Sequence, residues 1–97
     1  MIHEDERRIL EDWPEAKIIT AKQDCVLGNH CHKIKTEKFI LVDGEAYISI
    51  NSHGFIPLYK GEMITILPNE MHTFKLKHGS VLIGLCSHHY DPSDDYK

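Results

Sequence analysis

The chain has 97 residues, 41% of them hydrophobic and 27% charged, which is the size and composition of one globular domain. Its net charge of −4 argues against a nucleic-acid partner, and no segment is apolar for long enough to span a membrane. The acidic segment Met1–Glu6 is not typical of a signal peptide, so we expect a cytoplasmic protein whose Cys25, Cys31 and Cys86 are reduced.

The chain opens with a segment that could be a short helix and continues with strands. Residues 3–12 carry acidic groups at their start and apolar groups along one side, which predicts a short N-terminal helix that Pro14 ends. After Pro14, nine short runs rich in β-branched and aromatic residues alternate with turn residues. These runs are Ala16–Ala21, Asp24–Leu27, His30–Ile34, Glu37–Val42, Glu45–Ile50, Phe55–Leu58, Met63–Leu67, His72–Leu76 and Val81–Cys86.

This pattern of strands and turns predicts an all-β fold, an antiparallel barrel or sandwich. The dipeptide Asp43-Gly44 predicts a two-residue hairpin turn. We expect a single domain over residues 1–97, with a barrel core at about 16–87 and a polar, loosely ordered tail at 91–97.

Histidine is the unusual residue of the composition, with eight copies in 97 residues. In an extended strand alternate side chains share a face, so His30 and His32 are expected to point the same way and Cys31 the other way. A short connection can bring Glu37 beside them on the next strand, and His72 can supply a fourth group from a distant strand. Three imidazoles and one carboxylate suit one divalent transition metal, namely Zn, Mn, Fe, Ni, Co or Cu.

The segment around this group resembles the first motif of the cupin superfamily, which has the form G-x5-H-x-H-x4-E-x6-G. His30, His32, Glu37 and Gly44 stand at the spacing of the motif, and Asp24 replaces its leading glycine. A match of this length is more specific than a pair of histidines alone.

A second segment resembles the second cupin motif, G-x5-P-x-G-x2-H-x3-N. Gly61 and His72 are kept at the family spacing, whereas Leu67, Asn69 and Leu76 replace the proline, the glycine and the asparagine. Asparagine also tolerates left-handed turns. The resemblance implies a double-stranded β-helix, the cupin jelly roll, with all four positions that hold metal in the family intact.

The resemblance leaves three functions open, because a fold does not determine a function. The first is a small metalloenzyme of the isomerase, lyase or dioxygenase type that acts on a small polar metabolite. The second is a metal-independent sugar-nucleotide isomerase or epimerase, with His32 or His72 and Tyr47 moving protons. The third is a non-catalytic module that binds metal or a small ligand.

Side chains outside the four ligands give weaker indications. Tyr47 and His88 are the candidates for a catalytic acid or base, although a strand tyrosine in the core and an exposed strand end are the simpler interpretations. Lys33, Lys35 and Lys38 could attract an anionic substrate, but a solvated strand edge is the simpler interpretation.

The sequence also predicts an assembly. Ile9, Leu10 and Trp13 would gain burial against a second copy of the chain, so we expect a homodimer.

Overall fold

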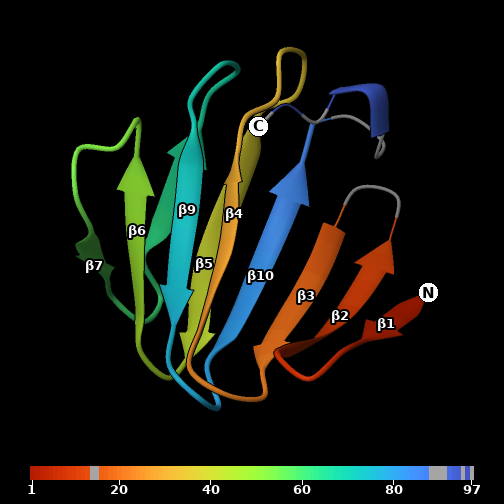
Figure 1. Cartoon of the computed structure of the whole chain (residues 1–97), viewed down its shortest axis with the longest axis vertical. Coiled ribbons are helices and arrows are strands. Elements are labelled where there is room, and N and C mark those ends of the chain that lie inside the picture. The colour runs from red at the N-terminus through yellow and green to blue at the C-terminus, as the bar shows by residue number, and fades with distance from the viewer. Residues whose placement is uncertain (14–15, 88–91, 95, 97) are drawn as a thin grey trace.

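The computed structural model describes residues 1–13, 16–87, 92–94 and 96, and in this part of the chain ten strands form two antiparallel sheets (Figure 1). The larger sheet has six strands, in the spatial order β1 (Ile2–Glu4), β2 (Arg8–Trp13), β3 (Ala16–Ala21), β10 (Val81–Cys86), β5 (Glu37–Asp43) and β8 (Met63–Ile66). The smaller sheet has four strands, in the order β4 (Cys25–His30), β9 (His72–Leu76), β6 (Ala46–Ile50) and β7 (Ile56–Leu58). A single 3₁₀ turn, η1, covers Pro92–Asp94. None of the described helical segments is long and apolar enough to cross a membrane.

The predicted all-β fold is confirmed, and the alternation of side chains along each strand explains it. Glu37, Phe39 and Leu41 are buried on β5, whereas Lys38 between them is exposed. On β9 the same alternation buries His72, Phe74 and Leu76. Side chains at alternate positions therefore fill the space between the two sheets, and the rings of Phe39 and Phe74 meet edge to face at 4.7 Å.

The predicted N-terminal helix over residues 3–12 is wrong. These residues form β1 and β2, which pair with each other, and β2 continues the larger sheet beside β3. The turn between them is closed by the Asp5 carboxylate, which accepts hydrogen bonds from the backbone N–H groups of Arg7 and Arg8. Isolated short helices are marginal, and the edge of β3 offers a full row of hydrogen bonds instead.

The turn at Asp43-Gly44 is present, but it is not the predicted hairpin. β5 belongs to the larger sheet and β6 to the smaller one, so the turn carries the chain from one sheet to the other. Gly44 has a φ of +88°, and a Cβ added there would lie 2.6 Å from the Cα of Ser80. Glycine is needed here for both its backbone conformation and its lack of a side chain.

The described residues of the C-terminal tail pack against the loop that follows β4. Tyr96 forms an isolated antiparallel bridge with Cys31, and its ring lies under the Lys33 ammonium at 4.3 Å. Asp94 is buried, and its carboxylate accepts hydrogen bonds from the backbone N–H groups of Lys33 and Ile34. The polar composition of this tail did not indicate these contacts.

Candidate metal centre

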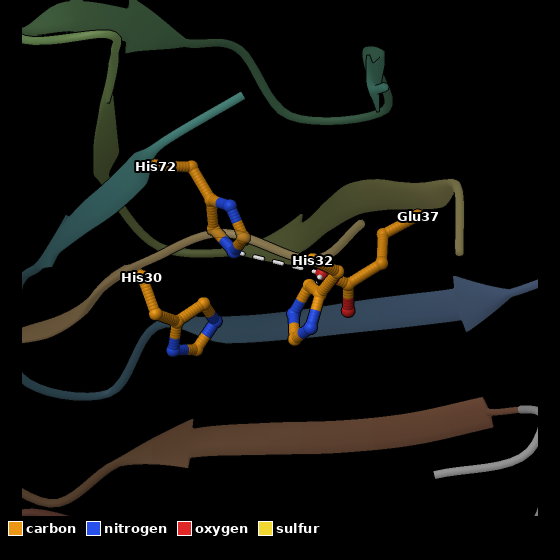
Figure 2. A group of neighbouring side chains, drawn as sticks. All are labelled: His30, His32, Glu37 and His72. Carbon is orange, nitrogen blue, oxygen red and sulfur yellow. Dashed lines mark ion pairs between the residues drawn. The ribbon is translucent and has the colours of Figure 1, made fainter. Parts of the chain in front are cut away.

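Three side chains from the two sheets and one from the loop after β4 meet in a cluster (Figure 2). His30 at the end of β4 is paired directly with His72 at the start of β9, so the smaller sheet places these two rings side by side. Glu37 is the first residue of β5 in the opposite sheet and is fully buried. The fourth member is His32, and the ligand atoms of the four residues all lie within 4.8 Å of one another.

His32 reaches the cluster from a loop and not from a strand, so the predicted strand His30–Ile34 is wrong. β4 ends at His30, and the pairing of β4 with β9 shifts register between Gly28 and His30. Gly28 has a φ of +96°, and a Cβ at this position would lie 2.9 Å from the carbonyl oxygen of His72. The irregularity therefore needs this glycine, and it turns the chain so that His32 also faces inward.

The orientation of His32 is set by the C-terminal tail. Its Nδ1 lies 2.7 Å from the backbone carbonyl oxygen of Asp94, which can only accept, so Nδ1 carries the proton and donates it. The backbone carbonyl of His32 in turn accepts from the N–H of Asn69, whose φ is +70°. A carbonyl partner of this kind is typical of metal-binding histidines, because it fixes the ring and leaves Nε2 free to bind.

The donor set tests whether a metal ion fits. The Nε2 of His32 faces the Glu37 Oε1 at 3.2 Å. Neither of these two buried atoms has a hydrogen-bond partner among the described residues. A ring nitrogen and a carboxylate oxygen at this distance are held together by a proton on the ring or by a metal cation that both atoms bind.

The distances agree with this interpretation. Glu37 Oε1 lies 3.2 Å from His32 Nε2 and 3.6 Å from His72 Nε2, the pair joined by the dashed line in Figure 2. Ligands about 2.1 Å from one ion stand roughly 3.0–3.4 Å apart when they are neighbours in its coordination sphere. The four predicted residues are thus brought together in a cluster that can hold a metal ion.

Protonation states in the cluster favour a metal ion as well. Burial lowers the pKa of His72, although the nearby Glu37 opposes this, so the ring is neutral at neutral pH. Burial alone would raise the pKa of Glu37, but the His32 ring and the Lys17 ammonium outweigh it and hold this pKa far below its usual range. A neutral imidazole and an ionised carboxylate are the forms that bind metal.

The second oxygen of Glu37 faces a different set of groups. Lys17 Nζ donates to Glu37 Oε2 at 3.0 Å, and Lys35 Nζ lies 3.9 Å from the same atom. The thiol of Cys86 donates to it at 3.6 Å, and burial raises the pKa of this thiol. The carboxylate is therefore held in place through Oε2 while Oε1 faces the histidines.

Lys17 was not singled out in the sequence, and Lys35 was named there only as one of three lysines that could attract an anion. Lys35 is only 6% exposed, so the interpretation of this residue as a solvated strand edge is wrong. Lys17 stands in the same strand phase as the buried Ile19 and Ala21, and a lysine in an inward phase is the signal that could have been used. Gly84 lies between Lys17 and Phe39 in the sheet, and a Cβ there would lie 2.7 Å from the Phe39 ring and 3.1 Å from the Lys17 side chain.

The two catalytic candidates are not brought into this cluster by the described structure. Tyr47 lies out of phase with the buried Ala46 and Ile48, on the outer face of the smaller sheet, where its hydroxyl donates to Glu45 at 2.6 Å. His88 lies outside the described residues.

Replacing Asp94 with alanine is expected to lower metal affinity about 10- to 100-fold, because the tail that orients His32 loses the hydrogen bonds that hold it. Competition with a chromophoric chelator measures this affinity. Asp24→Ala is the matched control, because Asp24 accepts a backbone hydrogen bond from His78 in an exposed turn elsewhere. Equal affinities for the two variants would contradict the role assigned to the tail.

Comparison with known proteins identifies the fold. No family model matches the chain, and no curated protein matches its sequence. Among solved structures, the capsular polysaccharide assembling protein CapF from Staphylococcus aureus superposes over 99% of this chain with a TM-score of 0.82 at 24% identity. The chain has the cupin fold. This cupin domain spans about a third of CapF, 31% of its length.

Two smaller proteins share the cupin fold over most of their own length. KdgF from a Halomonas species matches 96% of this chain and 90% of its own, with a TM-score of 0.79 and 16% identity. Pac13 from Streptomyces, described as a nucleoside dehydratase, matches 98% and 81%, with a TM-score of 0.72 and 15% identity. At these identities the likeness establishes the architecture alone.

Proposed function

We propose that this cupin is a metalloprotein that binds one divalent transition-metal ion through His30, His32, Glu37 and His72. The observation that carries the proposal is the buried cluster itself, because the ligand atoms of the three histidines and Glu37 lie within 4.8 Å of one another, and His32 Nε2 and Glu37 Oε1 have no hydrogen-bond partner among the described residues. Three imidazoles and one carboxylate are borderline ligands, and Zn, Mn, Fe, Ni, Co and Cu all fit such a set.

We propose further that the centre serves an enzyme that acts on a small polar metabolite. A bound divalent ion supplies Lewis acidity to a carbonyl or hydroxyl oxygen of the substrate. The protein contributes an apolar surface that excludes water beside the cluster, because Phe39 and Phe74 pack between the sheets next to His72. The structurally similar protein Pac13 is a nucleoside dehydratase that has been seen with uridine. This supports the proposal that a protein with this fold acts on a small polar metabolite.

The metal-independent alternative has less support. It requires a phenol near His32 or His72, and Tyr47 instead lies on the outer face of the smaller sheet. Without a metal ion, the ionised carboxylate of Glu37 would also lie next to the proton that this reaction transfers, and no cation would balance the charge on its Oε1.

Elemental analysis of the purified protein tests the metal proposal. We expect about one metal ion per chain, and we expect the His72→Ala variant to lose it because one of four ligands is gone. His78→Ala is the control, since His78 is exposed in a turn. Full metal content in the His72 variant would exclude this ligand set, and a metal-free wild type after reloading would exclude the proposal. A screen of metal-loaded protein on keto acids, sugars and nucleosides tests the enzymatic part.

We also propose a homodimer, formed through the outer face of the larger sheet. Apolar side chains recur on that face across five adjacent strands of the sheet: Ile9 and Trp13, Ile18, Ile83 and Leu85, Ile40 and Val42, and Met63. The prediction that Leu10 lies on this face with Ile9 and Trp13 is wrong, because Leu10 points inward and packs against the core. A shared face of this kind suits a two-fold dimer, the commonest homo-oligomer.

Ile83→Lys is expected to convert the dimer to a monomer, because it places a charge at the centre of this face. Light scattering coupled to size-exclusion chromatography measures the mass. The control is Val26→Lys, on the outer face of the other sheet, where Val26 is already 52% exposed. A monomeric wild type at micromolar concentration would contradict the assembly.

A further inference from the structure

A small cavity adjoins the histidines of the candidate metal centre. Its volume is about 50 Å³, and its polar side chains are Arg8, Lys17, His30 and His72. The other side chains on its wall are apolar. Since a water molecule occupies about 30 Å³ in the liquid, the cavity has room for one small group of a ligand.

The charged groups of this cavity are all positive. Arg8 reaches it from β2 and Lys17 from β3, and no described carboxylate lines it. Lys17 is already engaged with Glu37 Oε2. In the described part of the chain no carboxylate side chain lies within ion-pair distance of the Arg8 guanidinium. Asp5 accepts a hydrogen bond from the Arg8 backbone N–H and pairs with the guanidinium of Arg7 instead.

The balance of charge around the site points in the same direction. Arg8, Lys17 and Lys35 give three positive charges around the site, and Glu37 and Asp94 give two negative charges, so these groups carry a net charge of +1 before any metal ion is bound. The whole chain, by contrast, has a net charge of −4. A half-buried concentration of positive charge inside an acidic protein draws anions to one place and binds them strongly where water is excluded.

We propose that the substrate is a small anionic metabolite whose carboxylate or phosphate group enters this cavity and pairs with Arg8. The proposal rests on the metal centre proposed above, and it deepens it by naming the class of substrate. A guanidinium presents two parallel donors to such a group, which gives orientation as well as affinity. The group is then held beside His30 and His72, so the neighbouring carbon of the metabolite lies next to the metal ligands.

Binding of three small probes to the Co²⁺-loaded protein tests this proposal. Glycolate carries a carboxylate, inorganic phosphate carries the alternative anion, and glycolamide is the neutral counterpart of glycolate. Titration calorimetry measures the affinity of each, and the visible absorption of Co²⁺ reports ligands that enter its coordination sphere. We expect glycolate or phosphate, or both, to bind the wild type at least roughly ten-fold more tightly than glycolamide, the scale of one charge-assisted hydrogen bond.

Two arginine variants make the test specific. Arg8→Gln should lower the affinity of the bound anion by roughly ten-fold or more and leave the affinity for Co²⁺ and glycolamide unchanged. Arg7→Gln removes the same charge from the adjacent residue, which is exposed and paired with Asp5, and should behave as the wild type. The preference between glycolate and phosphate decides which anionic group the cavity takes.

The outcomes separate this proposal from the metal proposal. Anion affinity that is unchanged in Arg8→Gln, or glycolamide that binds as well as glycolate, would overturn the anionic substrate while leaving the metal centre intact. Failure of Co²⁺ to bind would overturn the metal centre. The same anion titrations on the metal-free protein, with the same two variants, then decide the role of Arg8 without the metal.

Discussion

Glu37→Gln is expected to abolish metal binding and to destabilise the metal-free protein by about 3–5 kcal/mol. The metal is lost because the only carboxylate of the cluster becomes a neutral amide. Stability is lost because the ammonium of Lys17, 3.0 Å from Glu37 Oε2, keeps its charge in a largely buried position without its partner. Elemental analysis measures the first effect and urea denaturation of chelator-treated protein the second.

Glu6→Gln is the matched control, because Glu6 is an exposed acid near the N-terminus. This variant should keep both the metal and the stability of the wild type. If Glu37→Gln retained a full equivalent of tightly bound metal, the ligand set would be refuted. If it lost metal but kept its stability, the lysine pairing would not matter to the fold.

Phe39→Ala is expected to lower the free energy of unfolding by about 3–5 kcal/mol, a large part of the total for a domain of this size. Phe39 is 2% exposed and its ring meets Phe74 at 4.7 Å, so its removal leaves a cavity between the sheets. Gly84 adds to this loss. The Phe39 ring packs directly over Gly84, which has no side chain that could fill the space left by the ring. Chemical denaturation measures the change.

Phe55→Ala serves as the comparison, because Phe55 is 42% exposed and its ring lies 4.5 Å from the Lys75 ammonium on the surface. Its removal should change stability by less than about 1 kcal/mol. Similar losses for both phenylalanines would mean that the space between the sheets is not the main core of this protein.

The strands of the barrel could be predicted from the sequence because alternation is a local property. The runs Glu37–Val42, His72–Leu76 and Val81–Cys86 agree with β5, β9 and β10 to within a residue. Pairing is not local, which is why Asp43-Gly44 was correctly placed as a turn and wrongly interpreted as a hairpin. The N-terminal segment failed for the same reason, since only the edge of β3 makes a strand of it.

The four residues of the candidate site do lie together, but the reason given for His32 is wrong. His30 and His32 do share one cluster, but His32 reaches it through the irregularity at Gly28 and the carbonyl of Asp94, and not through strand alternation. A contact between residues 62 positions apart leaves no mark in local composition. Lys17 was missed and Lys35 was assigned to a solvated edge, because a lysine usually faces solvent and only the structure shows both beside Glu37.

The two oxygens of Glu37 face different groups, which bears on how the proposed metal ion would be loaded. Lys17 and Cys86 hold the carboxylate through Oε2, so the carboxylate does not depend on the ion for its position. Folding can then precede loading, unlike in small zinc domains that are unfolded without metal. A preformed set of imidazoles follows the general affinity order of the divalent ions and has little power to refuse a competitor. The ion found in a preparation will therefore depend on which metals the producing cell supplies, and the native ion must be identified in the cell of origin.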